Sequence, residues 1–511
     1  MNSEIRKFAQ DFVFLVKNQP EHPALIVNTE LNSKIITYQH LEDLINRCLC
    51  LFQERGLQPG DRILSLLPNT VEAIVIFLST IKGGYGYAPL NCSATRRELD
   101  QWINLIRPKM SLTTSLINED MQAILGERCS EAITIETNAQ FDWLPEEGKQ
   151  PVYGDEPRLY LSTSGTTGAP KSLVIDSNIL WSSGCAFMNF HGQKDNSLCF
   201  WNYLPMSYLG GLFNLGLIPL CAGGSIVIDE PFSGKTFLEF WQTVDRYNIN
   251  ALWFVPSIVR GLLKMAERTH RQNMKDFGKK IKIAFLGTAP INLSTKQKFE
   301  EVFGIPLLEN FALSETTFFT TETIQTIKRC VEASVGEVLA YAEVKFVPTL
   351  EDKQEFMEIF VRSPFLFLGY LQQDGSLLKP FDSDGFFKTE DFGYMNKNND
   401  LVINGRKRDI IKKGGHFVSL KEIEVLAETH PAVREAAAVS IPHEFYGESS
   451  LLFVHLNDGF HEEQLSDISK FLHQNIVQYK WPEKIVISGK FSRTPSGKIQ
   501  KHLLAQEKAV S

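Results

Sequence analysis

Helical and extended segments alternate along much of this chain, and the alternation limits the folds that it can adopt. Residues 37–56 (TYQHLEDLINRCLCLFQERG) have a helical period, residues 61–67 (DRILSLL) form a β-type run, and residues 69–84 (NTVEAIVIFLSTIKGG) are helical again, before YGYAPLN at 85–91. The same order returns over residues 253–315. This pattern predicts βαβ units in a mainly parallel sheet with covering helices. We therefore predict an α/β fold.

The composition of the sequence changes at residues 394–415, YMNKNNDLVINGRKRDIIKKGG. The polar turns and basic residues of this segment are typical of a connection rather than a core. The residues that follow alternate helix, strand, strand, helix and a last strand. A chain of 511 residues also favours more than one domain. We predict a large N-terminal domain of mixed α/β sheets with covering helices (1–407) and a small mobile α+β C-terminal domain (408–511).

Composition excludes several classes of protein. A net charge of −8 argues against a nucleic-acid binder, because affinity for the phosphate backbone needs many Lys and Arg side chains. No apolar stretch approaches the ~20 residues of a transmembrane helix. The eight cysteines show no C-x-x-C spacing, and the first residues, MNSEIRKFAQ, lack the apolar core of a secretion signal. We expect a cytoplasmic protein with reduced thiols, no transmembrane segment and no nucleic-acid partner.

The strongest local motif is residues 161–171, LSTSGTTGAPK, directly after the β-type run RLYL. A loop of this composition can surround an anion with backbone N–H groups and hydroxyls, while a lysine supplies a fixed cation. Its glycine spacing differs from that of the G-x-x-x-x-G-K-[ST] loop. The motif therefore predicts a phosphate-binding loop, which we call the cradle loop, formed by Ser162, Thr163, Ser164, Gly165, Thr166, Thr167, Gly168 and Lys171.

This string resembles the signature loop of the adenylate-forming superfamily, which includes acyl- and aryl-CoA ligases, adenylation domains and firefly-type luciferases. Residues 310–315, NFALSE, resemble the family motif Tyr-Gly-x-Thr-Glu, which supports adenine and places a carboxylate on Mg²⁺. The resemblance implies Glu315 as the magnesium ligand, assisted by Thr166. It implies that adenine contacts come from Asn310, Phe311, Ala312 and Ser314.

Two further motifs extend the resemblance. Residues 387–391, FKTED, look like the family's Tyr-Arg-Thr-Gly-Asp, whose aspartate binds the ribose hydroxyls, and this implies Asp391 for that role. Residues 405–409, GRKRD, resemble the hinge segment, which implies that Arg406 contacts the nucleotide and that Arg408 is the pivot. The strand after the hinge, expected at residues 412–418, would bring Lys412 and Gly415 to a pantetheine arm.

Residues 494–498, TPSGK, match the family's terminal loop, whose lysine enters the active site. The resemblance implies that Lys498 bridges the substrate carboxylate and the α-phosphate, where a cation offsets the charge that develops during attack on phosphorus. Together with Thr166, Glu315 and Lys171, it completes the implied catalytic set.

Several positions depart from the family pattern. Ala312, Ser172 and Glu390 stand where glycine is usual, and Arg408 stands where Asp or Lys is commoner. Tyr208 appears in place of a gate histidine. We expect the departures to affect acid preference and rate rather than reaction class. The Phe-rich residues 317–320 and 365–368 fit either an acyl pocket or core packing.

The resemblance implies ATP-dependent activation of a small carboxylic acid as acyl-AMP, with ATP and Mg²⁺, followed by transfer to coenzyme A. An alternative is a stand-alone adenylation enzyme that loads the phosphopantetheine of an acyl or peptidyl carrier protein. A non-catalytic nucleotide sensor and a luciferase-like oxygenase are further readings. The sequence separates the first two poorly, and it identifies neither the acid nor the oligomeric state.

Overall fold

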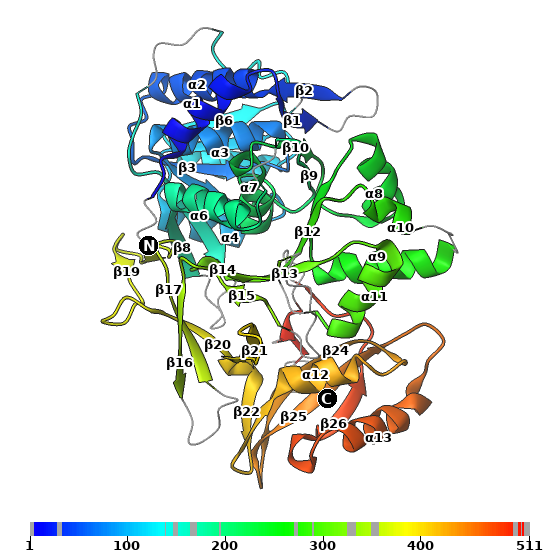
Figure 1. Ribbon diagram of the computed structural model, residues 1–511. Coiled ribbons are helices and arrows are strands. Elements are labelled where there is room, and N and C mark those ends of the chain that lie inside the picture. The colour runs from blue at the N-terminus through cyan, green and yellow to red at the C-terminus, as the bar shows by residue number, and fades with distance from the viewer. Residues whose placement is uncertain are drawn as a thin grey trace.

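The computed structural model places two large sheets, a smaller third sheet and a C-terminal sheet in one chain (Figure 1). The described residues are 5–27, 33–137, 139–146, 152–163, 171–193, 196–269, 274–288, 291–323, 334–348, 357–493, 499–501 and 503–504, with only the backbone described at Thr163, Lys171 and Arg408. The predicted α/β class is confirmed. Among the helices within these ranges, none is long and apolar enough to cross a bilayer.

The first large sheet is parallel from β13 to β1 and has antiparallel strands at both edges. Its order is β15 (Glu337–Val338), β14 (Thr317–Thr321), β13 (Leu308–Leu313), β12 (Ile283–Leu286), β11 (Ala251–Phe254), β9 (Cys199–Asn202), β10 (Ser225–Ile228), β1 (Pro23–Val27) and β2 (Lys34–Thr37). The parallel strands β12 and β13 therefore end at the same edge, where open α/β sheets bind ligands.

The second large sheet contains the strands on both sides of the cradle loop. Its order is β19 (Leu377–Leu378), β18 (Gly369–Leu371), β8 (Lys171–Asp176), β7 (Arg158–Thr163), β4 (Gly86–Pro89), β3 (Arg62–Leu66), β5 (Met110–Thr114) and β6 (Glu131–Ile135). β7 and β8 form an antiparallel pair, whereas β7, β4, β3, β5 and β6 are parallel. The cradle loop thus leaves the sheet at the carboxyl end of a parallel strand.

Helices cover these sheets, and their ends follow from the sequence. The Thr37 side chain caps α2 by accepting a hydrogen bond from the His40 backbone N–H. The Thr70 side chain caps α3 by accepting one from the Ala73 backbone N–H. α3 is buried along its whole length, which explains its nearly continuous apolar sequence. The helices of the large domain are α1 (Phe8–Asn18), α2 (Tyr38–Glu54), α3 (Val71–Gly83), α4 (Arg96–Ile106), α5 (Glu119–Arg128), α6 (Ser177–Phe190), α7 (Ile218–Cys221), α8 (Gly234–Arg246), α9 (Pro256–Thr269), α10 (Lys275–Gly278) and α11 (Leu293–Phe303).

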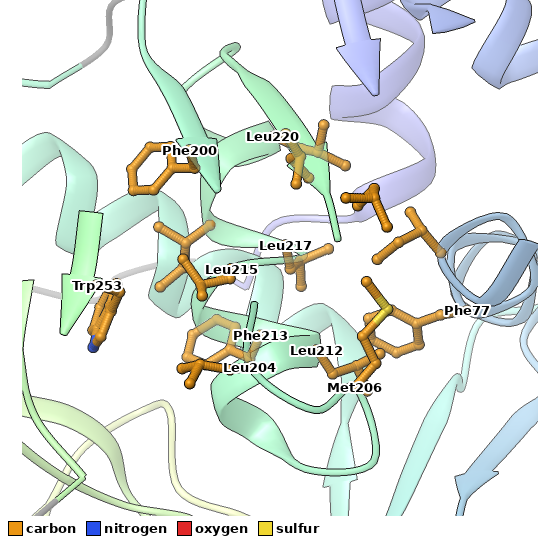
Figure 2. Close-up of a cluster of buried hydrophobic side chains, with 14 of the residues drawn as sticks. Phe77, Phe200, Leu204, Met206, Leu212, Phe213, Leu215, Leu217, Leu220 and Trp253 are labelled. Atoms are coloured by element: carbon orange, nitrogen blue, oxygen red, sulfur yellow. The ribbon is translucent and has the colours of Figure 1, made fainter. Parts of the chain in front are cut away.

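The core of the large domain joins the two sheets. Figure 2 shows Phe77 of α3 beside Leu212 and Met206, while Phe213 faces Trp253 of β11. These side chains belong to one buried cluster that also contains strand residues of both large sheets. The two sheets are therefore held as one body by shared apolar burial.

The third sheet corrects the prediction for residues 394–415. They are not a simple connection, because β20 (Phe387–Met395) and β21 (Leu401–Arg406) form a hairpin beside β17 (Met357–Arg362) and β16 (Glu343–Pro348). The polar residues occupy the turn, where Asn396 accepts hydrogen bonds from the Asn398 and Asp400 backbones. Leu401 and Val402 are buried. The sequence pattern did not predict β21, because this strand has only a few apolar residues and follows a polar turn.

The C-terminal sheet has the order β23 (His416–Ser419), β22 (Ile410–Lys413), β25 (Gly447–Leu456) and β24 (Val433–His443), with β26 (Lys484–Ile487) beside β25. The helices α12 (Leu420–Ala427) and α13 (Leu465–Asn475) complete a small α+β domain, as predicted. Residues 412–418 are not one strand. Gly414 and Gly415 both have positive φ, which closes a tight hairpin between β22 and β23.

A half-buried histidine at the end of α6 makes the fold sensitive to acid. The ring of His191 packs against Phe187 and Phe285, with ring centroids 4.7 and 4.9 Å away, and one ring nitrogen lies 3.3 Å from the Thr321 hydroxyl. Burial lowers the pKa of His191 to about 4. A histidine of the unfolded chain titrates near pH 6.5. The unfolded chain therefore binds more protons between these values, and this contribution to stability is lost as the pH falls from 6.5 towards 4.

We predict that His191→Phe flattens the pH dependence of stability, because the phenyl ring keeps the aromatic packing but has no proton to bind. The wild-type chain should lose up to ~3 kcal/mol of unfolding free energy through this one group between pH 7.5 and 4, and the variant should lack that loss. Urea unfolding at several pH values measures it. Parallel curves for the two proteins would contradict the assignment.

Candidate active site

The two ends of the cradle loop are fixed by a β-hairpin. Thr163 ends β7, Lys171 begins β8, and the two residues are paired in the antiparallel register. Ser162, the first predicted contact, is exposed on β7. The predicted contacts Ser164, Gly165, Thr166, Thr167 and Gly168 lie outside the described residues. The hairpin therefore holds both ends of the loop at one place on the second sheet.

Glu315 lies in the turn between β13 and β14, together with Ser314. Its carboxylate accepts a hydrogen bond from the Tyr370 hydroxyl (2.9 Å), and its backbone carbonyl accepts one from the Phe367 backbone (2.8 Å). Burial and the nearby Glu315 raise the pKa of Tyr370, so this hydroxyl remains a donor at neutral pH. Glu315 is thus held in place at both its main chain and its side chain.

The strand that carries Tyr370 links Glu315 to the cradle loop. β18 pairs with β8 so that Tyr370 lies opposite Leu173 and Leu371 lies opposite Ser172, the neighbour of Lys171. The exit of the cradle loop and Glu315 are therefore connected through three residues of one short strand. Two motifs that are far apart in the sequence meet here.

Asp391 and Arg406 form a second part of the site. They are paired across β20 and β21, and Arg406 Nε donates to Asp391 Oδ1 at 3.1 Å. The Thr389 hydroxyl accepts a hydrogen bond from the Asp391 backbone and donates to the Ile359 carbonyl. Burial alone would lower the pKa of Arg406, but the carboxylates of Asp391, Glu315 and Asp409 raise it overall. Arg406 therefore lies within the electric field of both predicted ligand-binding carboxylates.

Asn310 lies on β13, as do Phe311 and Ala312. Its side chain is buried, and Asn310 Nδ2 has no hydrogen-bond partner within the described part of the chain. Gly287 follows β12, where an added side-chain carbon would come within 2.7 Å of Asn310 Oδ1. The absence of a side chain at Gly287 leaves room for this amide at the ligand-binding edge of the sheet.

The remaining predicted residues lie elsewhere. Lys412 and Gly415 belong to the β22–β23 hairpin, where the Lys412 backbone donates to Glu448. Figure 1 shows β22, the strand of Lys412, apart from β13. Lys498 lies outside the described residues.

Tyr208 precedes an unusual helical turn. Residues Gly210–Asn214 form a π-helix, a form often found at functional sites. Burial raises the pKa of Tyr208, so its hydroxyl stays neutral. The Phe-rich segments pack in the core. The Phe318 ring is tilted against that of Phe187 at 4.4 Å and stacks with that of Phe213 at 5.6 Å, and Phe365 and Phe367 are buried.

Sequence analysis missed two residues that support the site. Tyr370 binds Glu315, and Thr389 holds the main chain at Asp391. Thr389 was visible within the motif at 387–391, but nothing in the sequence showed which way its hydroxyl faces.

The residues fit a magnesium ion of the kind that bridges nucleotide phosphates. Mg²⁺ in such sites takes one or two protein carboxylates, with phosphates and water as its other ligands. Glu315 is a half-buried carboxylate of the required type. No group of three or more His, Cys, Asp or Glu residues that could enclose a metal by itself occurs in the described ranges.

Comparisons with known proteins identify the family of the chain. Residues 14–371 match the family described as AMP-binding enzyme, and residues 422–498 match the AMP-binding enzyme C-terminal domain. The chain therefore belongs to the AMP-binding, adenylate-forming superfamily. Within it, the chain is an enzyme of the AMP-forming acid–thiol ligase type, the CoA ligases.

Similar proteins include oxalate–CoA ligase from Arabidopsis thaliana, which is 28% identical over 96% of both chains. 4-Coumarate–CoA ligase 3 from Oryza sativa subsp. japonica is 26% identical over 91% of this chain and 85% of its own. The crystal structure of ATP-bound MatB from Rhodopseudomonas palustris shares the fold, with a TM-score of 0.86, 24% identity and 99% coverage of each chain.

Glu390, one of the departures from the family pattern, has a strained backbone. Its φ is +61°, in the left-handed region that favours glycine, and its side chain is exposed. Its carboxylate lies close enough to contribute to the raised pKa of Tyr370. Glu390 therefore adopts a backbone conformation that glycine favours, and it places a carboxylate next to Asp391 in the chain.

We predict that Glu390→Gly raises the free energy of unfolding by up to ~1 kcal/mol, because glycine adopts this φ without a Cβ clash. Glu390→Ala is the matched control: it removes the same carboxylate but keeps the Cβ, so it should give no such gain. Urea unfolding of the three proteins decides. Equal stabilisation by both substitutions would assign the effect to charge instead of backbone strain.

Proposed function

We propose that this enzyme activates a carboxylic acid with ATP and transfers the acyl group to coenzyme A. In the first step a carboxylate oxygen attacks the α-phosphorus, the bond to the β-phosphate breaks, and pyrophosphate leaves. In the second step a thiol sulfur attacks the acyl carbon and AMP leaves, while the thiol proton passes to solvent. The observation that carries the proposal is the convergence of the cradle-loop hairpin, Glu315 and the Asp391–Arg406 pair.

Each group has a role that suits its chemistry. Asp391 accepts from the ribose hydroxyls, since a carboxylate is acceptor-only with two oxygens. The Asn310 amide, with the neighbouring Phe311, Ala312 and Ser314, supports adenine. The cradle loop and Lys171 hold the phosphates, while Arg406 adds positive charge beside them. Most of the rate enhancement then comes from position and charge rather than proton transfer.

Glu315 would hold Mg²⁺, assisted by Thr166, and the bound ion would neutralise phosphate charge. Tyr370 orients the carboxylate for that role. We also propose that the domains divide within the short 3-10 helix Lys407–Asp409, which connects the third sheet to the C-terminal sheet. A change of orientation about this helix would bring Lys412 and Gly415 towards the pantetheine thiol.

Coenzyme A as the acceptor is supported by the names of the relatives, which are CoA ligases or synthetases. The test is pyrophosphate exchange across fatty, aryl and amino acids and oxalate, followed by an assay for acyl-CoA with every acid that exchanges. Acyl-CoA formation is the expected result. Exchange without acyl-CoA would shift the acceptor to a carrier protein, and no exchange with any acid would contradict the proposal.

We predict that Lys498→Ala reduces adenylate formation at least ~10²-fold, because a positioned cation offsets the charge that develops on the attacked phosphate. Transfer from supplied acyl-AMP to coenzyme A should be retained. Lys490→Ala, which removes an exposed lysine from the same segment, should leave both half-reactions as in the wild type. Equal loss of both half-reactions in the Lys498 variant would contradict its role.

A further inference from the structure

One face of α9 carries basic residues that meet the small domain. Arg260, Lys264 and Arg268 follow one another at one-turn intervals, so they lie on the same side of the helix. Arg260 donates to Glu428 at 3.2 Å, and Lys264 and Arg268 contact Asp458 at 3.0 and 3.4 Å. The large domain therefore presents a basic edge to acidic residues of the small domain.

Glu428 is the buried centre of this contact. It follows the last residue of α12, and only 8% of its side chain is exposed. Its Oε2 accepts from both Arg260 and Asn292 Nδ2 (3.1 Å), and its Oε1 accepts from the Ala436 backbone (3.3 Å). Asp458, by contrast, is 73% exposed. A buried charge pair of this kind is lost at a much greater cost than an exposed one.

Asn292 gives up a common stabilising role to make its bond. It is the N-cap residue of α11, where an asparagine oxygen normally accepts a hydrogen bond from the first turn. Here the side chain makes no cap, and Asn292 Oδ1 is buried without a hydrogen-bond partner in the described part of the chain. If Glu428 moved away, rotation of Asn292 would restore the cap. Asn292 thus has a second favourable arrangement, in which its side chain caps α11 instead of binding Glu428.

α12 connects this junction to the C-terminal tail. Glu424 lies one turn before Glu428 and contacts Lys501 Nζ at 2.7 Å, while Lys501 also bonds Asp409 at 2.9 Å. Asp409 follows Arg406 by three residues and contributes to its raised pKa. Lys501 follows Lys498 by the same interval. In this orientation Lys501 is therefore tied to Asp409, three residues after Arg406, the proposed nucleotide contact.

We propose that Glu428, with Arg260 and Asn292, is a positioning latch that holds the small domain in the orientation for adenylate formation and must open for thiol transfer. The inference rests on the proposed two-step function. The latch touches no substrate and acts through α12, which fixes the tail relative to the large domain. The Asn292 cap offsets part of the free energy lost when the latch opens, so the two orientations stay close in free energy.

The test compares Glu428→Gln and Arg260→Gln with the full-length enzyme. Each should lower pyrophosphate exchange by about 5- to 150-fold, the range of a typical allosteric coupling, while single-turnover transfer from supplied acyl-AMP stays equal or becomes faster. The pyrophosphate exchange rate of the double variant should not fall below that of the less active single variant. Reversal of the pair, Arg260→Glu with Glu428→Arg, should recover part of the exchange activity. Asp458→Asn is the matched control and should change exchange less than about twofold, as expected for an exposed pair.

A second readout does not depend on activity. Trypsin cleavage at Lys407 or Arg408 should be faster in Glu428→Gln than in the wild type and in Asp458→Asn, at a temperature well below the onset of unfolding of each protein. Equal losses in both half-reactions, or unchanged cleavage, would overturn the latch. Absence of exchange in the wild-type enzyme would contradict the proposed function instead, and the cleavage rates would still decide whether the latch exists.

Discussion

The ion pair between Asp391 and Arg406 is the interaction on which the organisation of the site depends. It joins the last two strands of the third sheet, and the chain leaves that sheet directly after Arg406. Asp391 is almost fully buried, so its charge needs the guanidinium beside it. The same arginine lies in the field of Glu315 and Asp409. One cation thus links the proposed ribose contact, the proposed metal ligand and the start of the small domain.

Specific polar and charged contacts hold the small domain against the large one. Arg260 and Asn292 bind Glu428, and Lys264 and Arg268 contact Asp458. These groups are charged or polar, so their strength depends on geometry more than on area. A junction of this composition can be specific in one orientation and still open. An apolar interface of the same size would hold the domain more permanently.

Part of this site could be read from the sequence because its residues lie in compact motifs. The motifs that contain Asp391 and Glu315 are short, and their resemblance to motifs of the adenylate-forming superfamily implied the roles of these two residues. The partners could not be read in this way. Tyr370 reaches Glu315 across 55 residues, and Arg260 reaches Glu428 across 168, so only the folded chain brings each pair together. The hairpin of β20 and β21 was not predicted, because few residues of its turn and of β21 are apolar.

The sequence by itself determined the α/β class and the small second domain, because periodicity is a local property. It indicated the motif residues through their resemblance to a known family. Tertiary structure alone decided that β18 joins the cradle-loop hairpin to Glu315 and that Asn292 turns from its helix to Glu428. It also decided that β22, the strand of Lys412, lies apart from β13 (Figure 1). The physical reason is that strand order, domain orientation and side-chain direction depend on long-range packing, which short-range patterns do not encode.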